Sequence, residues 1–382
     1  MAAQVPGERI TGAECKDRLM SPIRVDCIVG ARPNFIKMAS ILAELGRRPG
    51  FQARLIHTGQ HFSPDMSQSF FDELSLPAPD LNLEAGGGSQ TQQTAEIMKR
   101  LEGPFQEFKP DLVLVVGDVN STVAAALVAA KLGIRIAHVE AGLRSFDRRM
   151  PEEINRLVTD VLSDYLFVTE PSGMTNLRAE GIPEERIFFT GNVMIDTLLR
   201  FREKAAQSDV LERFGLGAGN YATATLHRPS NVDDPAQLAG LLDCLCRLSQ
   251  RIPVMFPVHP RTRRMIESNG LATDGLILAP PLGYLDFLRL VSQSRLVLTD
   301  SGGIQEETTI LQVPCLTLRE NTERPVTIAQ GTNQLIGTNP ARVLEAALSS
   351  LDSAVPSGRV PELWDGQASG RIIDVLEREL RR

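Results

Sequence analysis

The sequence contains little cysteine and no long apolar segment. Its 382 residues include only five Cys, too few for a disulfide-rich secreted scaffold and in spacings that match no zinc site. We therefore expect a reducing cytoplasm and no bound metal. One of the longest apolar runs, Val123 to Ala130, has eight residues, whereas a membrane span needs roughly 18. The first residues also lack an apolar signal core, so we expect neither membrane insertion nor secretion.

The sequence also has no excess of positive charge. Lys and Arg number 40 against 47 Asp and Glu, which gives a net charge of −7. A dedicated duplex-DNA binder needs a basic face, so we expect no nucleic-acid partner. Apolar residues make up 42% of the chain, enough to build a core and to argue against disorder. At about 150 residues per domain, this length predicts two or three domains.

Short apolar runs alternate along the chain with amphipathic stretches of helical period. This alternation predicts an α/β fold in which helices cover both faces of a parallel sheet. In the first half, strands are predicted at 23–29, 53–57, 112–116, 134–138 and 166–169. In the second half, they are predicted at 221–226, 254–258, 276–279, 296–299 and 315–318. Helices are predicted at 36–45, 123–132 and 235–250.

The strand–helix pattern restarts after Asp196, which divides the chain into two Rossmann-like domains. We place these domains at 22–195 and 196–365, with a mobile tail at 1–21. A last helix at 366–382 has mixed charge and is able to pack back on the N-terminal domain. Ligands bind such sheets beyond the carboxyl ends of the strands, so two facing sheets predict a cleft that holds the functional site.

One candidate anion site lies in the second half, in the string VLTDSGGIQEE. A strand ends before Ser301, and Gly302 and Gly303 begin a helix. Free backbone N–H groups and the helix dipole favour a phosphate there, and Glu307, about one turn further on, is placed to accept hydrogen bonds from a ribose diol. A capped helix with no ligand is the alternative, and this string alone does not exclude it.

A similar turn occurs near the N-terminus, in the string GARPN. Arg32 follows a predicted strand, and Lys37 lies in the helix that comes next. The further glycines of a dinucleotide-binding fingerprint are missing. Two cations beside a backbone turn suit a phosphate or a sugar hydroxyl, although an ordinary surface pair remains the simpler alternative.

Carboxylates follow neighbouring predicted strands of the first half. Asp118 and Glu140 each come directly after a strand, and Glu152 and Glu153 begin a helix. Clustered carboxylates can hold unequal pKa values, as an acid/base pair requires. Asp118 also suits a helix N-cap, and acids favour helix N-termini whatever their function. Glu140 is the hardest to explain by structure alone, and no metal-site spacing appears.

Two charged strings follow predicted strands of the second half. His227 comes after the strand ATATL, where it suits a phosphate contact or a proton shuttle; a structural histidine is the alternative. The string LRENTERP places Arg319, Glu320, Glu323 and Arg324 in a loop that ends at a proline. These fixed charges suit either recognition of an oxygen-rich ligand or an ion pair between the domains.

Taken together, these strings resemble the non-hydrolysing UDP-N-acetylglucosamine 2-epimerase family. They occur in family order from about Arg24 to the C-terminus. The matching strings are GARPNFIKM, HTGQHF, PDLVLVVGDVNST, HVEAGLRSFDRRMPEEINR, TGNVMID, TLHRPSNVD, PVHPRTR, LTDSGGIQEE, RENTERP and WDGQASGRI.

The resemblance implies a GT-B-type fold and an isomerase that interconverts UDP-N-acetylglucosamine (UDP-GlcNAc) and UDP-N-acetylmannosamine (UDP-ManNAc). It implies removal of the C2 proton with loss of UDP to give a glycal, then re-addition of UDP, without a nicotinamide cofactor. It further implies a cytoplasmic homodimer that supplies polysaccharide biosynthesis. A relative acting on a UDP-diacetamido-uronic acid and a hydrolysing relative that releases ManNAc and UDP are the alternatives. A glycosyltransferase and a non-catalytic sensor explain the carboxylates less well.

The resemblance also implies roles for individual residues. Asp118, Glu140 and Glu152 match the family's acid/base carboxylates, and His227 matches its active-site histidine near the diphosphate. The implied substrate contacts are Arg32, Lys37, Ser301, Gly302, Gly303, Glu307 and Arg324. Some bacterial members bind a second, activating UDP-GlcNAc, and the strings linked to that site contain Gln60, His61 and His259.

The chain departs from the family pattern at several places. Asn34 stands where many members have Glu, and HRPSN replaces a common HRxEN. The loop at 145–150 is shorter than in the best-known bacterial form, and GGGSQTQQT also differs. These differences bear on the exact sugar and on regulation more than on the chemistry.

Overall fold

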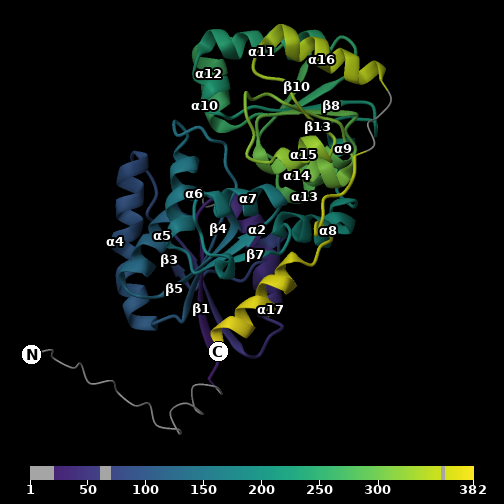
Figure 1. Cartoon of the computed structure of the whole chain (residues 1–382). Coiled ribbons are helices and arrows are strands. Elements are labelled where there is room, and N and C mark those ends of the chain that lie inside the picture. Colours follow the sequence, from purple (N-terminus) through teal and green to yellow (C-terminus); the bar gives the residue numbers. More distant parts are fainter. Residues whose placement is uncertain (1–20, 61–69, 354–357) are drawn as a thin grey trace, which may run out of the picture.

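Two parallel β-sheets in two lobes organise the structure, a computed structural model that describes residues 21–60, 70–353 and 358–382 (Figure 1). The first sheet has the strand order β3-β2-β1-β4-β5-β6-β7. Its strands are β1 (Ile23–Val29), β2 (Phe51–His57), β3 (Leu81–Asn82), β4 (Leu112–Val116), β5 (Arg135–Ala141), β6 (Tyr165–Val168) and β7 (Ile187–Phe189). The helices of this half are α2 (Arg32–Leu45), α4 (Gln90–Phe108), α5 (Asn120–Lys131), α6 (Pro151–Leu162), α7 (Pro171–Ala179) and α8 (Val193–Ala205).

The second sheet has the strand order β10-β9-β8-β11-β12-β13. Its strands are β8 (Ala222–Thr225), β9 (Val254–Pro257), β10 (Leu276–Ala279), β11 (Leu296–Thr299), β12 (Cys315–Thr317) and β13 (Asn333–Leu335). The helices of this half are α9 (Val210–Arg213), α10 (Pro229–Val232), α11 (Pro235–Leu248), α12 (Pro260–Ser268), α13 (Tyr284–Ser292), α14 (Gly302–Leu311), α15 (Pro325–Ala329) and α16 (Pro340–Asp352). The last helix is α17 (Ala368–Leu380).

These two sheets confirm the predicted fold class. All five residues of β4 are buried, as expected for a strand that is covered on both faces and therefore apolar throughout. The prediction missed β3, β7 and β13, which are only two or three residues long and lie at or near sheet edges. It also ended β5 too early, because the strand continues through Glu140 to Ala141.

Each sheet contains a point at which the order of its strands reverses. In the first sheet β1 lies between β2 and β4, and in the second β8 lies between β9 and β11. The loops that follow such strands diverge to opposite faces and leave a crevice in which ligands bind. Arg32 follows β1 and Asp118 follows β4, so both lie where the first sheet reverses its strand order. His227 follows β8 and Ser301 follows β11, so both lie at the corresponding point of the second sheet.

The C-terminal helix lies beside the first half of the chain. Figure 1 shows α17, in yellow, against α2, and its buried Ile372 and Leu376 join the core of that half. The carboxylate of Asp196 caps its first turn by accepting hydrogen bonds from the backbone N–H of Ala368 (3.1 Å) and Ser369 (2.7 Å). The domain limits proposed at 195 and 365 stay predictions, and residues 1–20 of the expected tail lie outside the described residues.

The described helices include none that is both long and apolar enough to span a bilayer.

Candidate active site

Glu140 lies at an irregular point of β5. The register between β5 and β6 breaks between Val139 and Ala141, and Glu140 itself has a φ of +76°. This left-handed backbone is uncommon for a residue other than glycine, and such bulges redirect a side chain. The buried carboxylate of Glu140 forms ion pairs with Lys37 and, at 2.5 Å, with Nη2 of Arg324. Cations from both halves of the chain therefore meet one carboxylate.

Arg324 is the cation that joins the two halves. Besides Glu140, its guanidinium forms ion pairs with Glu306 at 2.8 Å and Glu323 at 2.6 Å. Burial opposes the charge of Arg324, but the surrounding carboxylates raise its pKa well above the usual value. Burial also raises the pKa of Glu306, against the effect of Arg324. The cluster therefore concentrates charge in a site from which water is largely excluded, where ionic contacts are strong.

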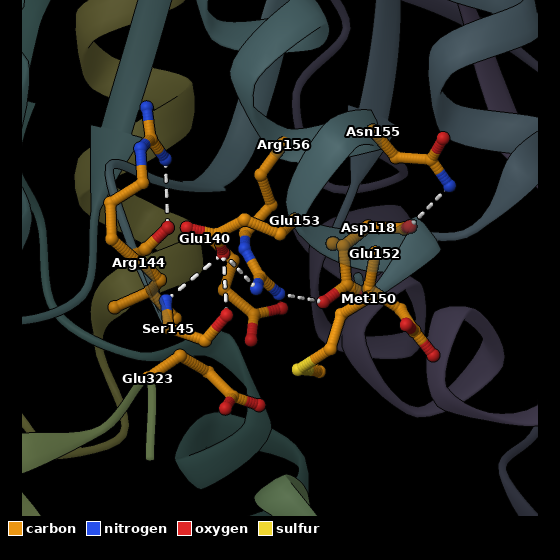
Figure 2. Close-up of polar contacts among 12 residues, drawn as sticks. Asp118, Glu140, Arg144, Ser145, Met150, Glu152, Glu153, Asn155, Arg156 and Glu323 are labelled. Atoms are coloured by element: carbon orange, nitrogen blue, oxygen red, sulfur yellow. Dashed lines mark hydrogen bonds and ion pairs between the residues drawn. The ribbon is translucent and has the colours of Figure 1, made fainter. Parts of the chain in front are cut away.

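Asp118 lies beside this cluster and is held by Arg156. Figure 2 shows the Arg156 guanidinium between Asp118 and Glu153, with an ion pair to each. Burial disfavours the charge of Asp118, but Arg156, Lys37 and Arg324 together hold its pKa below the usual range. Asn155 also donates to the backbone carbonyl of Asp118 at 2.9 Å. Asp118 is thus fixed in place as an ionised carboxylate.

Two adjacent acids at the start of α6 have different surroundings. Glu153 is buried and accepts hydrogen bonds from the backbone N–H of Ser145 and Phe146, both at 2.9 Å. It therefore holds the loop before α6. Glu152 is partly exposed, and its Oε1 lies 3.2 Å from Nη1 of Arg228 in the second half. Of the two, Glu152 is the acid that faces the interdomain contact.

Two glycines, one from each half, allow the charged cluster to form. Gly117 has a φ of +68°, and a Cβ there would lie 2.9 Å from Nζ of Lys37. A Cβ on Gly302 would lie 2.4 Å from Nη1 of Arg324. A side chain at either position would force the end of Lys37 or Arg324 to move, and at Gly117 the positive φ would add backbone strain. Gly302 therefore has a packing role as well as its predicted contact with an anion.

The remaining part of the predicted anion site lies at the start of α14. Ser301 is the N-cap residue of this helix, yet its side chain makes no capping hydrogen bond. Gly303 follows in the first turn, where a Cβ would lie 3.1 Å from Cε of Met194. The helix N-terminus thus presents backbone N–H groups and a hydroxyl, an arrangement that favours a phosphate.

Glu307 and Arg32 interact electrostatically across the two halves. Arg32 donates to the carbonyl of Leu282 at 3.1 Å, and its guanidinium lies 4.4 Å from the Phe70 ring centroid. Burial raises the pKa of Glu307 to about 7, although Arg32 opposes this rise. Burial also lowers the pKa of Arg32, against the effect of Glu307. The structure therefore places both predicted substrate contacts together.

His227 lies at the second crevice, beside a buried aspartate. Its Nδ1 is 2.7 Å from Oδ1 of Asp300. The His227 ring centroid lies 5.9 Å from that of His259, which is the N-cap residue of α12. His259 therefore lies next to the predicted active-site histidine.

The other predicted regulatory residues belong to the first half. The side chain of Gln60 accepts hydrogen bonds from the backbone N–H (2.9 Å) and the hydroxyl (2.7 Å) of Ser121. It ties the loop after β2 to α5. His61 lies outside the described residues.

Asn34, one of the departures from the family pattern, has a structural role. Its side chain accepts from the backbone N–H of Gly30 and Ala31 at 3.2 Å and donates to the carbonyl of Val116 at 2.9 Å. These bonds hold the first turn against the end of β4.

Several residues that contact the proposed site residues were not predicted as functional. Arg156 and Glu306 form ion pairs with proposed site residues, and Asp300 lies beside His227. Asp300 carried a usable signal, because it follows a strand directly, as Asp118 does. Arg156 and Glu306 gave no such signal, because both lie within helices. Within the described ranges, no group of three or more His, Cys, Asp or Glu is placed to hold a metal ion.

Comparison with known proteins identifies the family to which this architecture belongs. A family model described as UDP-N-acetylglucosamine 2-epimerase matches residues 43–377. A UDP-N-acetylglucosamine 2-epimerase homolog of Methanococcus maripaludis is 43% identical over 361 residues, covering 93% of this chain and 99% of the relative. The UDP-2,3-diacetamido-2,3-dideoxy-D-glucuronate 2-epimerase of Pseudomonas aeruginosa is 40% identical, covering 93% of this chain and 100% of the relative.

A solved structure of the same family is also similar to this chain. The crystal structure of Methanocaldococcus jannaschii UDP-GlcNAc 2-epimerase in complex with UDP-GlcNAc and UDP is similar with a TM-score of 0.88 and 39% identity, covering 93% of this chain and all 100% of that one. Because the family model and these relatives span most of the chain, the protein belongs to the UDP-N-acetylglucosamine 2-epimerase family and is an isomerase.

Proposed function

We propose that the protein interconverts UDP-GlcNAc and UDP-ManNAc without net hydrolysis. The contact between Glu140 and Arg324, at 2.5 Å, carries this proposal. It joins the carboxylates of the first half to the predicted UDP site of the second. Asp118 and Glu152 lie at the same junction, through Arg156 and Arg228 respectively. An enzyme that moves a proton at C2 while it releases UDP from C1 needs this juxtaposition.

The proposed reaction breaks two bonds and later re-forms them. The C2 proton passes to a carboxylate, and the electron pair of the C2–H bond becomes the C1=C2 double bond of the glycal. The electron pair of the C1–O bond leaves on the β-phosphate oxygen of UDP. UDP then adds back to C1 while a proton is delivered to the opposite face of C2. The product differs from the substrate only in configuration at C2.

Removal and return of the proton on opposite faces require more than one acid/base group. We assign this work to Asp118, Glu140 and Glu152. The pKa of Asp118 is held below the usual range by its neighbouring cations, despite its burial, so it is charged at neutral pH. Acid/base groups of this kind contribute about 10²- to 10⁴-fold each. His227 and Lys37 complete the proposed catalytic and sugar-binding set.

UDP is proposed to bind at the start of α14. Ser301, Gly302 and Gly303 would hold the diphosphate, because the helix N-terminus favours negative charge. Glu307 would accept hydrogen bonds from the ribose hydroxyls, which requires its ionised form. Because the pKa of Glu307 is raised to about 7 by burial, UDP binding should strengthen as the pH rises through that value. Arg32 and Arg324 would add cationic contacts.

A UDP-diacetamido-uronic acid is the second candidate substrate. The relative of that specificity from Pseudomonas aeruginosa is 40% identical, close to the 43% of the UDP-GlcNAc 2-epimerase homolog. A side-by-side measurement of kcat/KM for UDP-GlcNAc and UDP-2,3-diacetamido-2,3-dideoxy-D-glucuronate separates the two. We expect UDP-GlcNAc to be preferred. Turnover of the uronate alone would replace the proposed sugar, and free ManNAc as the main product would indicate a hydrolysing enzyme.

The family resemblance supports four wider proposals. We infer a cytoplasmic homodimer that supplies polysaccharide biosynthesis, with Gln60, His61 and His259 as candidate residues of a regulatory UDP-GlcNAc site. Light scattering of the purified protein tests the dimer. A sigmoidal dependence of rate on UDP-GlcNAc concentration, abolished by Gln60→Ala, tests the regulatory site.

A further inference from the structure

Asp300 is a fully buried carboxylate that follows β11 and is not among the residues assigned to the proposed reaction. Its oxygens accept hydrogen bonds from the backbone N–H of His227 and of Arg228, each at 2.9 Å, and from Nδ2 of Asn231 at 3.1 Å. Nδ1 of His227 lies 2.7 Å from Oδ1. Burial opposes its charge, but His227 and these N–H donors lower its pKa to about 2. Asp300 is therefore a rigidly held anion.

A second His–Asp pair in the molecule shows what a purely structural pair looks like. His138 and Asp160 are both fully buried, and Nδ1 of His138 lies 2.7 Å from Oδ1 of Asp160. The other ring nitrogen, Nε2, lies 2.8 Å from the carbonyl oxygen of Gly117. Both nitrogens of this ring are used inside the protein, so no ligand can meet either of them.

The His227 pair differs in its exposure. The side chain of His227 is 37% exposed, whereas that of Asp300 is 0% exposed. Since Asp300 engages Nδ1, only Nε2 of His227 remains available to a ligand. The histidine also lies beside β11, the strand after which Ser301 begins the proposed UDP site. An imidazolium held in this way would present a single N–H to an anion bound at α14.

We propose that Asp300 is a positioning residue that holds His227 with its Nδ1 protonated and its Nε2 toward the diphosphate, and that stabilises the imidazolium which hydrogen-bonds the departing UDP. This inference rests on the proposed function, since it assigns a role at that same site. When the C1–O bond breaks, its electron pair adds negative charge to the β-phosphate oxygen. The Nε2–H of His227 stabilises that charge as a hydrogen-bond donor, and no proton needs to be transferred. A buried aspartate fixes tautomer and orientation in the same manner in catalytic triads.

A double-mutant cycle tests whether Asp300 acts through His227. Asp300→Asn, measured with UDP-GlcNAc, is expected to lower kcat about 100-fold, within the range for loss of one preorganised hydrogen-bond donor. The KM for UDP-GlcNAc should change by less than about threefold, because the extra charge on the β-phosphate oxygen develops only as the C1–O bond breaks. In a His227→Ala background, Asp300→Asn should cause no further loss, because residues that act as a unit are non-additive. Unchanged kcat in the single variant, or an equal loss in both backgrounds, would overturn the proposal.

A control separates positioning from folding. Asn231→Ala removes another partner of Asp300 but leaves the His227 contact, so it should lower the melting temperature while kcat stays within about threefold of wild type. A fall in kcat as large as that of Asp300→Asn would show that the whole loop matters, and not the His–Asp pair.

A measurement on the wild-type protein tests the proposal even if the Asp300→Asn variant does not fold. ¹⁵N NMR of histidine-labelled wild-type protein with saturating UDP should show His227 protonated at both ring nitrogens. A His227 ring without a proton on Nδ1 would contradict the proposal. Because UDP is common to every candidate substrate, this result does not depend on the sugar. Loss of UDP-GlcNAc turnover would instead count against the proposed function alone.

Discussion

The carboxyl edges of the two sheets contribute different parts of the proposed site. The edge of the first sheet supplies acids, among them Asp118, Glu140 and Glu152, and the edge of the second supplies Arg324, Arg228 and the start of α14. The paired acids and arginines meet at Glu140–Arg324 and Glu152–Arg228. Each half also pairs charges internally, as Lys37 does with Glu140 and Arg324 with Glu323, but neither half contains both sets of predicted groups. The predicted proton chemistry and the predicted hold on UDP become one site only where the two edges meet.

The largest expected effect comes from removing the acid at the centre of this contact. Glu140→Gln keeps the shape of the side chain but loses its charge and basicity, so we expect kcat to fall by about 10³-fold or more. The dissociation constant of UDP, measured by calorimetry, should stay within about threefold of wild type, since UDP binds at the other edge. Unchanged turnover would remove Glu140 from the proposed mechanism.

The cross-domain ion pairs should differ in their contribution to stability. Arg324→Met leaves three buried carboxylates without their shared cation, and we expect the free energy of unfolding to fall by about 3–5 kcal/mol. The matched variant Arg228→Met breaks a partly exposed pair with Glu152 and a longer contact, at 3.9 Å, with Glu323. Because Glu323 keeps Arg319 and Arg324 as partners, this variant should cost only about 1 kcal/mol. Urea denaturation measures both. Equal losses would show that burial does not distinguish the two contacts.

A smaller effect is expected at the anion site of the second edge. Ser301→Ala removes a hydroxyl that makes no capping bond, so the helix should keep its stability. Loss of one hydrogen bond to the diphosphate should weaken UDP binding by about 5- to 10-fold, with kcat at saturating substrate nearly unchanged. UDP affinity equal to that of wild type would count against the assignment of Ser301.

The smallest effect concerns the pH dependence of the same edge. Burial raises the folded-state pKa of Glu307 to about 7, above its unfolded value, so its stabilising contribution is complete below the unfolded pKa and is lost as the pH rises through about 7. Glu307→Gln should flatten this fall in unfolding free energy between about pH 5 and pH 8. It should also remove the rise in UDP affinity over the same range. A pH profile identical to wild type would show that another group is responsible.

The fold was largely predictable because buried parallel strands are apolar throughout. The runs at 112–116, 276–279 and 296–299 match their strands without change. The edge strands β3 and β13 are too short to form a pattern. Asp118 and Glu140 were predicted to lie together, because neighbouring parallel strands end at the same edge of a sheet.

The finer parts of the site depend on tertiary contacts that no local pattern contains. Glu152 and Glu153 are identical in type and adjacent, and only the direction of each side chain on α6 separates the buried acid from the one at the interdomain contact. The positive φ of Glu140 arises from a break in strand register, which the sequence VEAG does not reveal. The pairing of Arg324 with Glu140 joins residues 184 positions apart.

Incubation of the wild-type enzyme with UDP-GlcNAc in D₂O tests the central claim most directly. If carboxylates of the first half remove and return the C2 proton while the second half holds UDP, the UDP-ManNAc formed must carry deuterium from the solvent at C2. UDP-ManNAc that retains its original hydrogen at C2 would contradict this account.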